Sequence, residues 1–450
     1  MRAHSIKITL SIVLLTFSFR HAIGQSVPQK IDSLIQAYSK INKFNGNIMV
    51  LRSGQTIFKG AYGYRNMEQH IKNSGEEIVP IASLTKSFTS LMIMKLIEEG
   101  RLSLDTRVTT FFPALHPDQP ITISNLLNHT SGIREVLADA GLKEKIFAGM
   151  KVSHAELLSY FSGQPLDFKP GTHYAYCNSG YDILGMIIEK ITGKTYESAV
   201  NENIFKPLKM NKSGYDYARL QSQYKTVGYS YISATRHTTA PVWDTSWEYS
   251  SGGLYSSLSD LAKLDQALQT NKLIRKESLA KTYTPTHWSY GYGWFVHTLY
   301  GKQVAYHSGN LEGATSYFGR IPEDDICIII LLNETNTIIE SLANKVIAIL
   351  YDQPYVLPKP KQAIALSDEQ LKKYVGTYDI SDAYRTSIAL KDHFLYLSTN
   401  QMAPIQILPE NENRFFSRNS NMTVTFSTGQ TGKLALKIQD GLSTKIGELQ

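Results

Sequence analysis

Alternation of apolar and polar residues marks two stretches that lie far apart in the chain. Residues 46–51 and 56–62 alternate on either side of Ser53-Gly54, which predicts a β-hairpin that turns at this dipeptide. The alternation returns late in the sequence, with Pro322-Glu-Asp-Asp325 as the turn between its last two segments. We expect these later strands at residues 293–297, 304–307, 315–320 and 326–332.

Helical periodicity dominates the chain between these two stretches. The segment from Pro80 to Gly100 predicts a helix of about five turns, with proline at its entrance and glycine at its exit. From about residue 105 to 240 the pattern is helical and rich in loops, which indicates a helical lobe inserted into one sheet domain over residues 25–351. A cleft between two such lobes is a natural place for a site. Further helices are expected at 124–129, 154–161, 181–192, 259–269 and 338–351.

The C-terminal part of the chain has a different character. Residues 352–364 are rich in proline and predict a stiff linker. From 365 to 450, after one short helical stretch, brief alternating segments predict a small all-β domain of barrel or sandwich type. The expected fold class is therefore α/β (α+β), an antiparallel sheet flanked by helices with a helical insertion, plus a small C-terminal all-β domain.

Residues 1–24 predict a secretory signal peptide. Arg2 and Lys7 give a positive n-region, and residues 8–19 form an apolar stretch that is too short to cross a bilayer. The small-x-small sequence at residues 22–24 is a cleavage site. An N-terminal membrane anchor is the alternative. We expect export to the periplasm or the extracellular space, with no transmembrane segment in the mature chain.

The composition is that of an ordinary globular protein. Of the 450 residues, 42% are hydrophobic and 19% are charged, which supports a sizeable core, and the length favours two folded units. Loss of residues 1–24 lowers the formal net charge from +7 to +4, and so mild a charge does not favour a nucleic-acid partner. Because no zinc-ligand spacing, phosphate loop or dinucleotide fingerprint occurs, we expect no metal and no cofactor.

Both cysteines of the sequence, Cys177 and Cys327, belong to the mature chain. One disulfide is permitted in an oxidising compartment. However, Cys327 lies in the apolar run 326–332, which predicts a buried strand, whereas Cys177 lies in a polar loop. We therefore expect two free thiols.

Ser83 and Lys86 form a Ser-x-x-Lys pair at the start of the helix predicted over residues 80–100. At this spacing the two side chains emerge on one face. A partly desolvated lysine can be neutral enough to take the serine proton, and a helix N-terminus directs N–H groups toward a reacting carbonyl. The pattern recurs at Ser222–Lys225 and Ser278–Lys281, so an ordinary helix-start serine is the alternative. The first copy differs because a strongly apolar helix follows it, and such a helix must be buried.

Two further motifs carry candidate site residues. In Tyr176-Cys177-Asn178 an extended backbone points the tyrosine and the asparagine to one side and the cysteine to the other. A tyrosine beside an ammonium group can accept a proton, and an asparagine can hold a lysine and a substrate amide together. His307-Ser308-Gly309 is the one His-x-Gly of the sequence, on a strand whose edge can offer the N–H of Asn310 to an oxyanion. Taken singly, a packing tyrosine and a structural histidine are the alternatives.

Together these motifs have the order and approximate spacing of class C β-lactamase-like serine hydrolases, the penicillin-binding-protein-related group, which this chain resembles. The likeness covers about residues 30–350 and implies a β-lactamase/transpeptidase-like sheet. The segment Tyr374–Tyr378 is similar to the small β domains that many members carry. Connecting segments that share the likeness are Leu126–Ile133, Tyr181–Glu189 and Gly252–Ser256.

The resemblance implies a role for each candidate residue. Ser83 attacks a carbonyl, and Lys86 and Tyr176 share the proton transfers. Asn178 orients the substrate and Lys86, while the N–H groups of Ser83 and Asn310 form the oxyanion hole. Which of Lys86 and Tyr176 is the base stays open.

One position departs from the family pattern. β-Lactamases and many related peptidases carry a lysine where this chain has His307, and that lysine favours substrates with a carboxylate. We expect His307 and Gly309 to bind substrate. Because a histidine is mostly neutral at pH 7, His307 weakens the case for lactam hydrolysis and widens the expected activities to those of esterases and aminopeptidase-like members.

We therefore expect an exported serine hydrolase that cleaves an ester or amide bond through an acyl-enzyme on Ser83, of the esterase or D-amino-acid peptidase type. The alternatives are a catalytically silent protein that binds penicillin or envelope peptides, and a true β-lactamase. A thiol enzyme based on Cys177 is disfavoured, because that thiol has no evident base partner. The expected partner is a small-molecule or peptide substrate, peptidoglycan-derived peptides included, and the oligomeric state is left open.

Overall fold

The structure is a computed structural model that describes most of the chain. The predicted signal peptide at residues 1–24 lies outside the described residues. Among the residues that are described, no helix is long and apolar enough to cross a membrane. The described residues are 25–286, 289–381, 384–399, 402–417, 422–429, 431–440 and 443–449.

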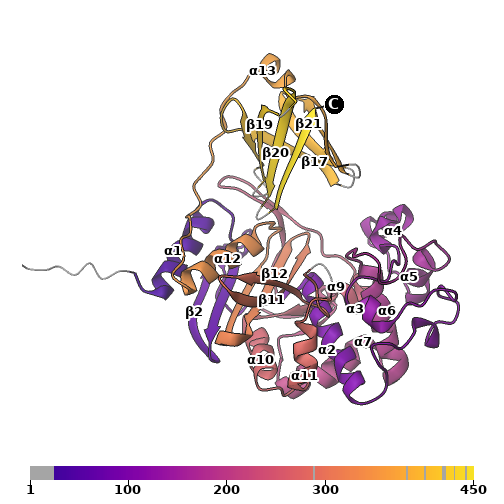
Figure 1. Ribbon diagram of the computed structural model, residues 1–450. Helices are drawn as coiled ribbons and strands as arrows, with labels where there is room; N and C mark the ends of the chain where they lie inside the picture. Colours follow the sequence, from indigo (N-terminus) through magenta and orange to yellow (C-terminus); the bar gives the residue numbers. More distant parts are fainter. Residues whose placement is uncertain are drawn as a thin grey trace, which may run out of the picture.

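A six-stranded antiparallel sheet forms the centre of the larger domain (Figure 1). Its strand order is β10-β11-β12-β13-β1-β2, so the two ends of this domain meet where β1 (Gly46–Arg52) pairs with β13 (Ile326–Leu332). The early hairpin and the late strands therefore belong to one sheet, as their alternation predicts. The other strands are β2 (Gln55–Tyr62), β10 (Phe295–Leu299), β11 (Lys302–Leu311) and β12 (Ala314–Ile321).

Alternate residues of β1 enter separate hydrophobic cores on the two faces of this sheet. Ile48 and Val50 pack in one core, whereas Met49 and Leu51 pack in the other. A strand turns successive side chains to opposite faces, so a sheet covered on both sides buries both sets. The covering helices are α1 (Val27–Lys40) and α12 (Ile339–Leu350) on the first face, with α2 (Thr85–Glu98) and α10 (Leu258–Gln269) on the second.

A lobe of helices and loops lies beside the sheet (Figure 1). Its longest helix, α6, begins at Asn178, three residues before the helix predicted at 181–192. The local sequence cannot reveal this start, because the cap is distant: Glu135 accepts the backbone N–H of Asn178 at 2.6 Å. The lobe contains α3 (Ile123–Leu127), α4 (Ala140–Phe147), α5 (His154–Phe161), α6 (Asn178–Thr192), α7 (Tyr196–Val200), α8 (Lys206–Leu208) and α9 (Tyr249–Gly252), and α11 (Lys276–Thr282) follows α10.

Short strands that the sequence pattern does not indicate tie this lobe to the sheet domain. β5 (Val79–Pro80) pairs with β9 (Leu254–Ser256), which brings the segment before Ser83 next to the residues that follow α9. This pairing joins parts of the chain that are distant in sequence. The other short strands are β3 (Tyr64–Asn66), β4 (Ile71–Lys72), β6 (Gly214–Tyr215), β7 (Tyr229–Ile232) and β8 (His237–Thr239).

The C-terminal residues form a closed eight-stranded barrel, which confirms the predicted small β domain. Residues 353–367 contain no helix or strand and lead into the short helix α13 (Asp368–Lys372), whose N-terminus Ser367 caps. Tyr378, Phe415 and Leu436 fill the barrel interior. The strands are β14 (Gly376–Ser381), β15 (Tyr384–Lys391), β16 (Phe394–Thr399), β17 (Met402–Pro409), β18 (Arg414–Phe416), β19 (Thr423–Thr428), β20 (Leu434–Asp440) and β21 (Ser443–Leu449).

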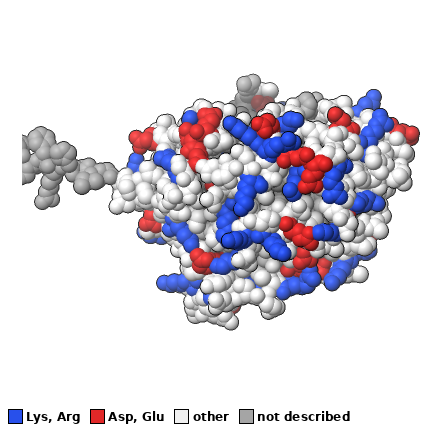
Figure 2. Space-filling model, turned by 90° about the horizontal axis from the view of Figure 1, so that it is seen from below, with Lys and Arg blue, Asp and Glu red and all other residues white. Residues whose placement is uncertain are grey.

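The surface charge is mixed, and the cysteines are free. Basic and acidic side chains are interspersed over the face shown in Figure 2. Cys177 and Cys327 are both buried and unbridged, as expected. The Cys177 thiol contacts the carbonyl oxygen of Ile133 at 3.2 Å, and burial raises its pKa to about 12, which keeps it protonated.

Candidate active site

Ser83 lies in a 3₁₀ turn, Ala82–Leu84, and not in the first turn of one continuous helix. The α-helix α2 begins only at Thr85 and ends before Gly100. The backbone of Ala82 has φ 46°, a conformation that L residues rarely adopt and that the surrounding structure must hold. This turn presents the Ser83 hydroxyl at the mouth of a cleft while α2 stays buried behind it.

Lys86 is fully buried and has three oxygen partners. Its Nζ atom lies 3.1 Å from Oγ of Ser83 and donates to Oδ1 of Asn178 at 2.7 Å. It also donates to the carbonyl oxygen of Ser251 at 2.8 Å. Burial lowers the pKa of Lys86 to about 8, because a buried ammonium group loses its hydration.

Three carboxyl groups surround Lys86 and act against this lowering. Asp182, Glu135 and Glu248 each raise the pKa of Lys86 by their charge, and Asp182 has the largest effect of the three. Asp182 is completely buried, and among the described residues neither of its oxygens has a hydrogen-bond partner of good geometry. Burial raises the pKa of Asp182 well above its usual value and that of Glu248 to about 8. The charge of the one buried lysine, Lys86, therefore cannot keep all of the surrounding carboxyl groups ionised.

Tyr176 and Asn178 reach the same cleft from the start of α6. The backbone of Cys177 between them is extended, with φ −143° and ψ 121°, so the two side chains share a side. Glu135 holds Asn178 twice, through its backbone N–H at 2.6 Å and its side-chain amide at 3.1 Å. The Nζ atom of Lys86 lies 4.9 Å from the centre of the Tyr176 ring.

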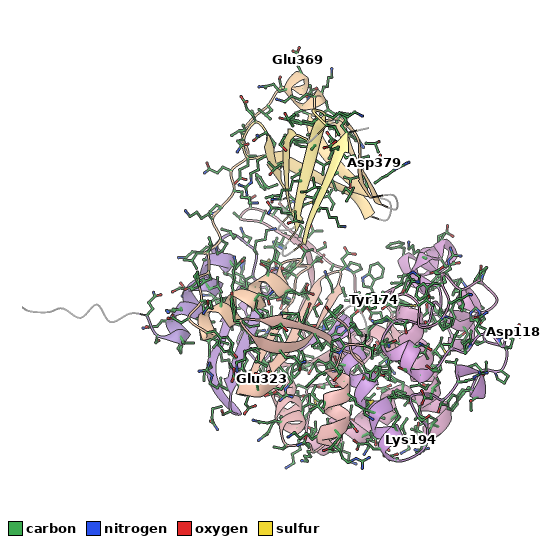
Figure 3. All side chains as sticks on the ribbon, viewed as in Figure 1. Asp118, Tyr174, Lys194, Glu323, Glu369 and Asp379 are labelled. Carbon is green, nitrogen blue, oxygen red and sulfur yellow. The ribbon has the colours of Figure 1, made fainter. Side chains whose placement is uncertain are left out.

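The Tyr176 hydroxyl is a protonated phenol in this environment. Burial raises its pKa above the usual value, and an interaction with Ser83 offsets only part of this rise. The ring is held by His129, whose centroid is 4.4 Å away and whose Nδ1 accepts the backbone N–H of Cys177 at 3.1 Å. Tyr174, labelled in Figure 3, lies at the rim of the site, and its ring centre is 6.0 Å from that of His129.

His307 is buried, 1% exposed, and both of its ring nitrogens bond to protein groups. Nδ1 lies 2.7 Å from the carbonyl oxygen of Ser308, which can only accept, so Nδ1 carries the proton. Nε2 then accepts the hydroxyl of Tyr290 at 3.0 Å. Burial lowers the pKa of His307 to about 3, and the charge of Lys86 adds to this effect, so the imidazole is neutral.

Gly309 and Asn310 form the part of β11 that passes beside Ser83. A Cβ atom on Gly309 would lie 2.0 Å from the carbonyl oxygen of Ile81 and 2.9 Å from the backbone N of Ser83. Only glycine permits so close an approach of two backbones. Ser316 fixes the same segment, because its hydroxyl donates to the Ile81 carbonyl at 2.6 Å. The two candidate oxyanion donors, the N–H groups of Ser83 and Asn310, thus belong to backbones in direct contact.

A cavity of about 100 Å³ opens at Ser83. Residues from five parts of the chain line it, so the fold assembles it from distant segments. Among the described residues that line it, Glu248 is the ionisable one. The lining residues are Ala82, Ser83, Val136, Leu137, Asn178, Trp247, Glu248, Ser251, Gly252, Asn310 and Leu311.

The structure brings most of the predicted site residues to one cleft. Lys86 contacts Ser83, Asn178 and the ring of Tyr176, while Gly309 of β11 lies against Ser83 and Asn310 lines the same cavity. His307 belongs to the same strand and is buried, with its ring centre 6.4 Å from that of Tyr176. Five further residues at the site were not predicted from the sequence: His129, Glu135, Asp182, Glu248 and Tyr290. His129 and Asp182 fall within segments that share the family likeness, whereas nothing in the local sequence distinguishes Glu248. No cluster of candidate metal ligands occurs among the described residues.

Comparison with family models gives two matches along the chain. A model described as Beta-lactamase matches residues 31–350. A model described as a domain of unknown function, DUF3471, matches residues 360–443. The first match spans more than half of the chain and contains every residue of the cleft.

Individual relatives agree with this match. A penicillin-binding protein of Bacillus subtilis (strain 168) is 27% identical over 447 residues, 93% of this chain and 98% of that protein. The structure of an octameric penicillin-binding protein homologue from Pyrococcus abyssi has a TM-score of 0.63 and 27% identity, over 93% of this chain and 99% of that one. A D-stereospecific amidohydrolase from Streptomyces sp. has a TM-score of 0.61 and 25% identity, over 71% of this chain and 96% of that one.

Proposed function

This chain belongs to the β-lactamase family, and from that premise we propose that it is an exported serine hydrolase that cleaves an ester or amide bond through an acyl-enzyme on Ser83. The observation that carries the proposal is the hydrogen bond between Lys86 and Ser83. Lys86 has three partners, and two of them, Oδ1 of Asn178 and the carbonyl oxygen of Ser251, can only accept. When Lys86 is neutral, its lone pair is therefore directed at the Ser83 hydroxyl.

In the first step Oγ of Ser83 attacks the substrate carbonyl carbon while its proton passes to neutral Lys86. A pKa of about 8 for Lys86 supports this role, since an appreciable fraction of the amine is neutral near neutral pH. Tyr176 is less suited to begin as the base, because burial keeps its phenol protonated. The N–H groups of Ser83 and Asn310 would hold the oxyanion that forms on the carbonyl oxygen.

Collapse of this intermediate breaks the bond to the leaving group. The departing alcohol or amine takes a proton from Tyr176, and the phenolate regains one from the ammonium group of Lys86, whose Nζ lies against the Tyr176 ring. An acyl group then remains on Ser83. Water attacks the acyl carbon while Lys86 takes its proton. The bond between the acyl carbon and Oγ of Ser83 then breaks, Lys86 returns the proton to Oγ, and the acid leaves.

The groups around the cleft favour substrates without a carboxylate beside the scissile bond. His307 is neutral and bonded to Tyr290 and Ser308, so it supplies no positive charge. Glu248 lines the cavity instead, and its carboxyl can accept a hydrogen bond from a substrate amine or amide. This supports an esterase or an amidase or peptidase for D-amino-acid compounds over a true β-lactamase, in keeping with the amidohydrolase among the structural neighbours.

An activity probe tests the proposal directly. The mature protein is incubated with a fluorophosphonate and, separately, with a labelled penicillin, and the modified peptide is located by mass spectrometry. We expect a fluorophosphonate adduct on Ser83, and none on Ser83→Ala, the matched control. Absence of any Ser83 adduct in folded protein would support the catalytically silent alternative, and efficient turnover of penicillin would support a β-lactamase. Mass analysis of the exported protein is expected to show an N-terminus at Gln25.

A further inference from the structure

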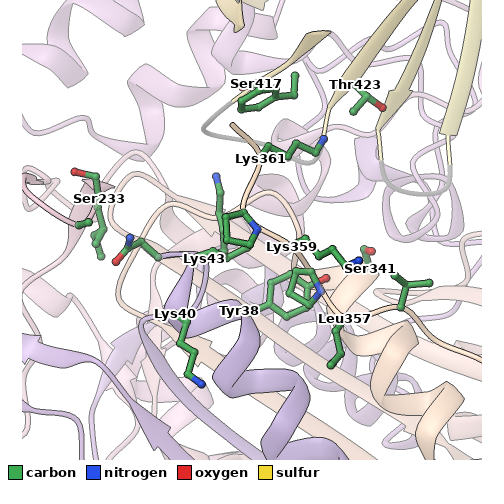
Figure 4. Close-up of a pocket in the computed structure, with 18 of the residues that line it drawn as sticks. Tyr38, Lys40, Lys43, Ser233, Ser341, Leu357, Lys359, Lys361, Ser417 and Thr423 are labelled. Atoms are coloured by element: carbon green, nitrogen blue, oxygen red, sulfur yellow. The ribbon is translucent and has the colours of Figure 1, made fainter. Parts of the chain in front are cut away.

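A second cavity, of about 770 Å³, lies between the sheet domain and the barrel (Figure 4). Its described lining residues do not include Ser83. The sheet domain contributes the end of α1 with the residues after it, and also α12 and β7. The linker contributes residues 356–361, and the barrel contributes β18, β19 and β20. The volume falls within the range of about 300–1,000 Å³ that is usual for small-molecule sites.

The lining of this cavity is strongly basic. Five lysines and one arginine line it, and no aspartate or glutamate does so among the described lining residues. They come from both domains and the linker, so folding, and not a run of basic sequence, gathers the charge. The basic residues are Lys40, Lys43, Lys345, Lys359, Lys361 and Arg414.

The acid groups behind the lining compensate only part of this charge. Arg414 forms an ion pair with Glu410 at 3.2 Å, and Glu334 acts on Lys43. Lys345 has a neutral partner, because its Nζ donates to the Tyr38 hydroxyl at 2.8 Å. Glu410 and Glu334 are thus the acid groups found beside these six cations in the part of the chain that the structure describes.

The charges of these cations lower the pKa values of their neighbours. Burial lowers the pKa of Lys43, and the charge of Lys361 lowers it further. Burial also lowers the pKa of Lys361, and the charge of Arg414 adds to that effect. An anion placed among these three groups would relieve the repulsion and gain charge-assisted hydrogen bonds.

We propose that this interdomain cleft binds a small organic anion that carries phosphate groups. Phosphate is favoured over carboxylate because five of the six cations are ammonium groups, compact charges that suit a multi-oxygen dianion, and Nε of the one guanidinium group, Arg414, already lies 3.2 Å from Glu410. The ligand also has an apolar or aromatic part, because Tyr38, Leu357 and Phe416 line the same space. The bound ligand joins the linker to both domains.

Calorimetric titration of the full mature chain tests this site. The probes are inorganic phosphate, inorganic pyrophosphate and ADP, which separate a free phosphate from a phosphate ester with an aromatic body, and citrate represents carboxylates. The test variant is Lys43→Gln/Lys361→Gln. The matched control is Lys276→Gln/Lys281→Gln, which removes the same charge from exposed positions of α11, far from the barrel (Figure 1).

We expect saturable binding of pyrophosphate or ADP with one site per chain, weakened by added salt. The affinity should fall at least about tenfold in the test variant and stay unchanged in the control. A second variant, Lys40→Gln/Lys359→Gln, changes exposed positions and should also weaken binding. Binding should persist in Ser83→Ala, so this proposal and the proposed hydrolase can fail separately.

Three results would overturn the inference. The first is the absence of saturable binding of pyrophosphate and ADP at low salt. The second is an affinity in the two cavity variants that equals the affinity in the α11 control. The third is tighter binding of citrate than of pyrophosphate. Circular dichroism and thermal unfolding, which do not depend on the reactivity of Ser83, show that each variant is folded.

Discussion

The hydrogen bond between Lys86 and Ser83, 3.1 Å long, can run in either direction. The other two partners of the Lys86 amine are acceptors, as described above, so the proton state of Lys86 decides which way the bond with Ser83 points. The charged amine donates to the serine oxygen, whereas the neutral amine accepts the serine proton. Reactivity of Ser83 should therefore follow the neutral fraction of Lys86.

Replacement of this amine should remove most of the activity without unfolding the protein. We expect Lys86→Met to lower the rate of fluorophosphonate labelling of Ser83 by about 100- to 10,000-fold, because it removes the proton acceptor. The matched control is Lys95→Met on the same helix, at a partly exposed position. Labelling of Lys86→Met at the normal rate would assign proton removal to another group.

The labelling rate should rise with pH through the pKa of Lys86. That pKa, about 8, lies below the usual lysine value, so the active neutral form accumulates as the pH passes upward through it. The Asp182→Asn variant should move the midpoint to lower pH, because Asp182 is the carboxyl that most raises this pKa. Glu277→Gln, an exposed change on α11, is the control. A midpoint that does not move in Asp182→Asn contradicts this electrostatic account.

The close approach of β11 to Ser83 predicts a penalty for any side chain at Gly309. Gly309→Ala adds a methyl group that would clash with Ile81 and Ser83, so we expect the free energy of unfolding to fall by about 1–3 kcal/mol. Labelling of Ser83 should slow by about 10- to 100-fold, because the oxyanion donors move apart. In Gly180→Ala the same methyl group has its nearest neighbour at 3.5 Å, so this variant is the control. Equal free energies of unfolding and equal labelling rates in Gly309→Ala and Gly180→Ala would show that the close approach of β11 to Ser83 is not required.

Glu248 should set part of the substrate preference. Its pKa is about 8, so its carboxyl is mostly neutral at about pH 6 and mostly ionised at about pH 9, where it repels a substrate carboxylate. We expect discrimination against carboxylate-bearing esters, measured as a ratio of kcat/KM to a neutral ester, to increase over this range about fivefold. In Glu248→Gln the ratio should be independent of pH. A ratio that still changes with pH would assign the discrimination elsewhere.

Much of the fold follows from local patterns in the sequence. The alternation in residues 46–62 and after 290 predicts strands of one sheet, and the late β segments predict the barrel. The 3₁₀ turn at Ser83 and the early start of α6 do not follow, because they depend on contacts with β9 and Glu135, which are far away in sequence. Strand pairs as short as β5–β9 leave no periodic signal.

The candidate site also combines residues that local motifs predict with residues that only the fold brings together. Ser83, Lys86, Tyr176 and Asn178 can be selected because their motifs occur together in order. The groups that tune them are not selected in this way. Asp182 lies in a segment that shares the family likeness and Glu248 in none, and both acquire their influence only when folding buries them beside Lys86. The neutral state of His307 likewise depends on its burial and on Tyr290.

An acyl-enzyme on Ser83 can be trapped and identified by its mass. The protein is mixed with a p-nitrophenyl ester or with D-alanine p-nitroanilide, quenched in acid and analysed by intact-mass and peptide mass spectrometry. We expect one acyl group, located on Ser83, absent in Ser83→Ala and strongly reduced in Lys86→Met. An acyl group on another residue, or undiminished turnover by Ser83→Ala, would contradict the proposed acyl-enzyme.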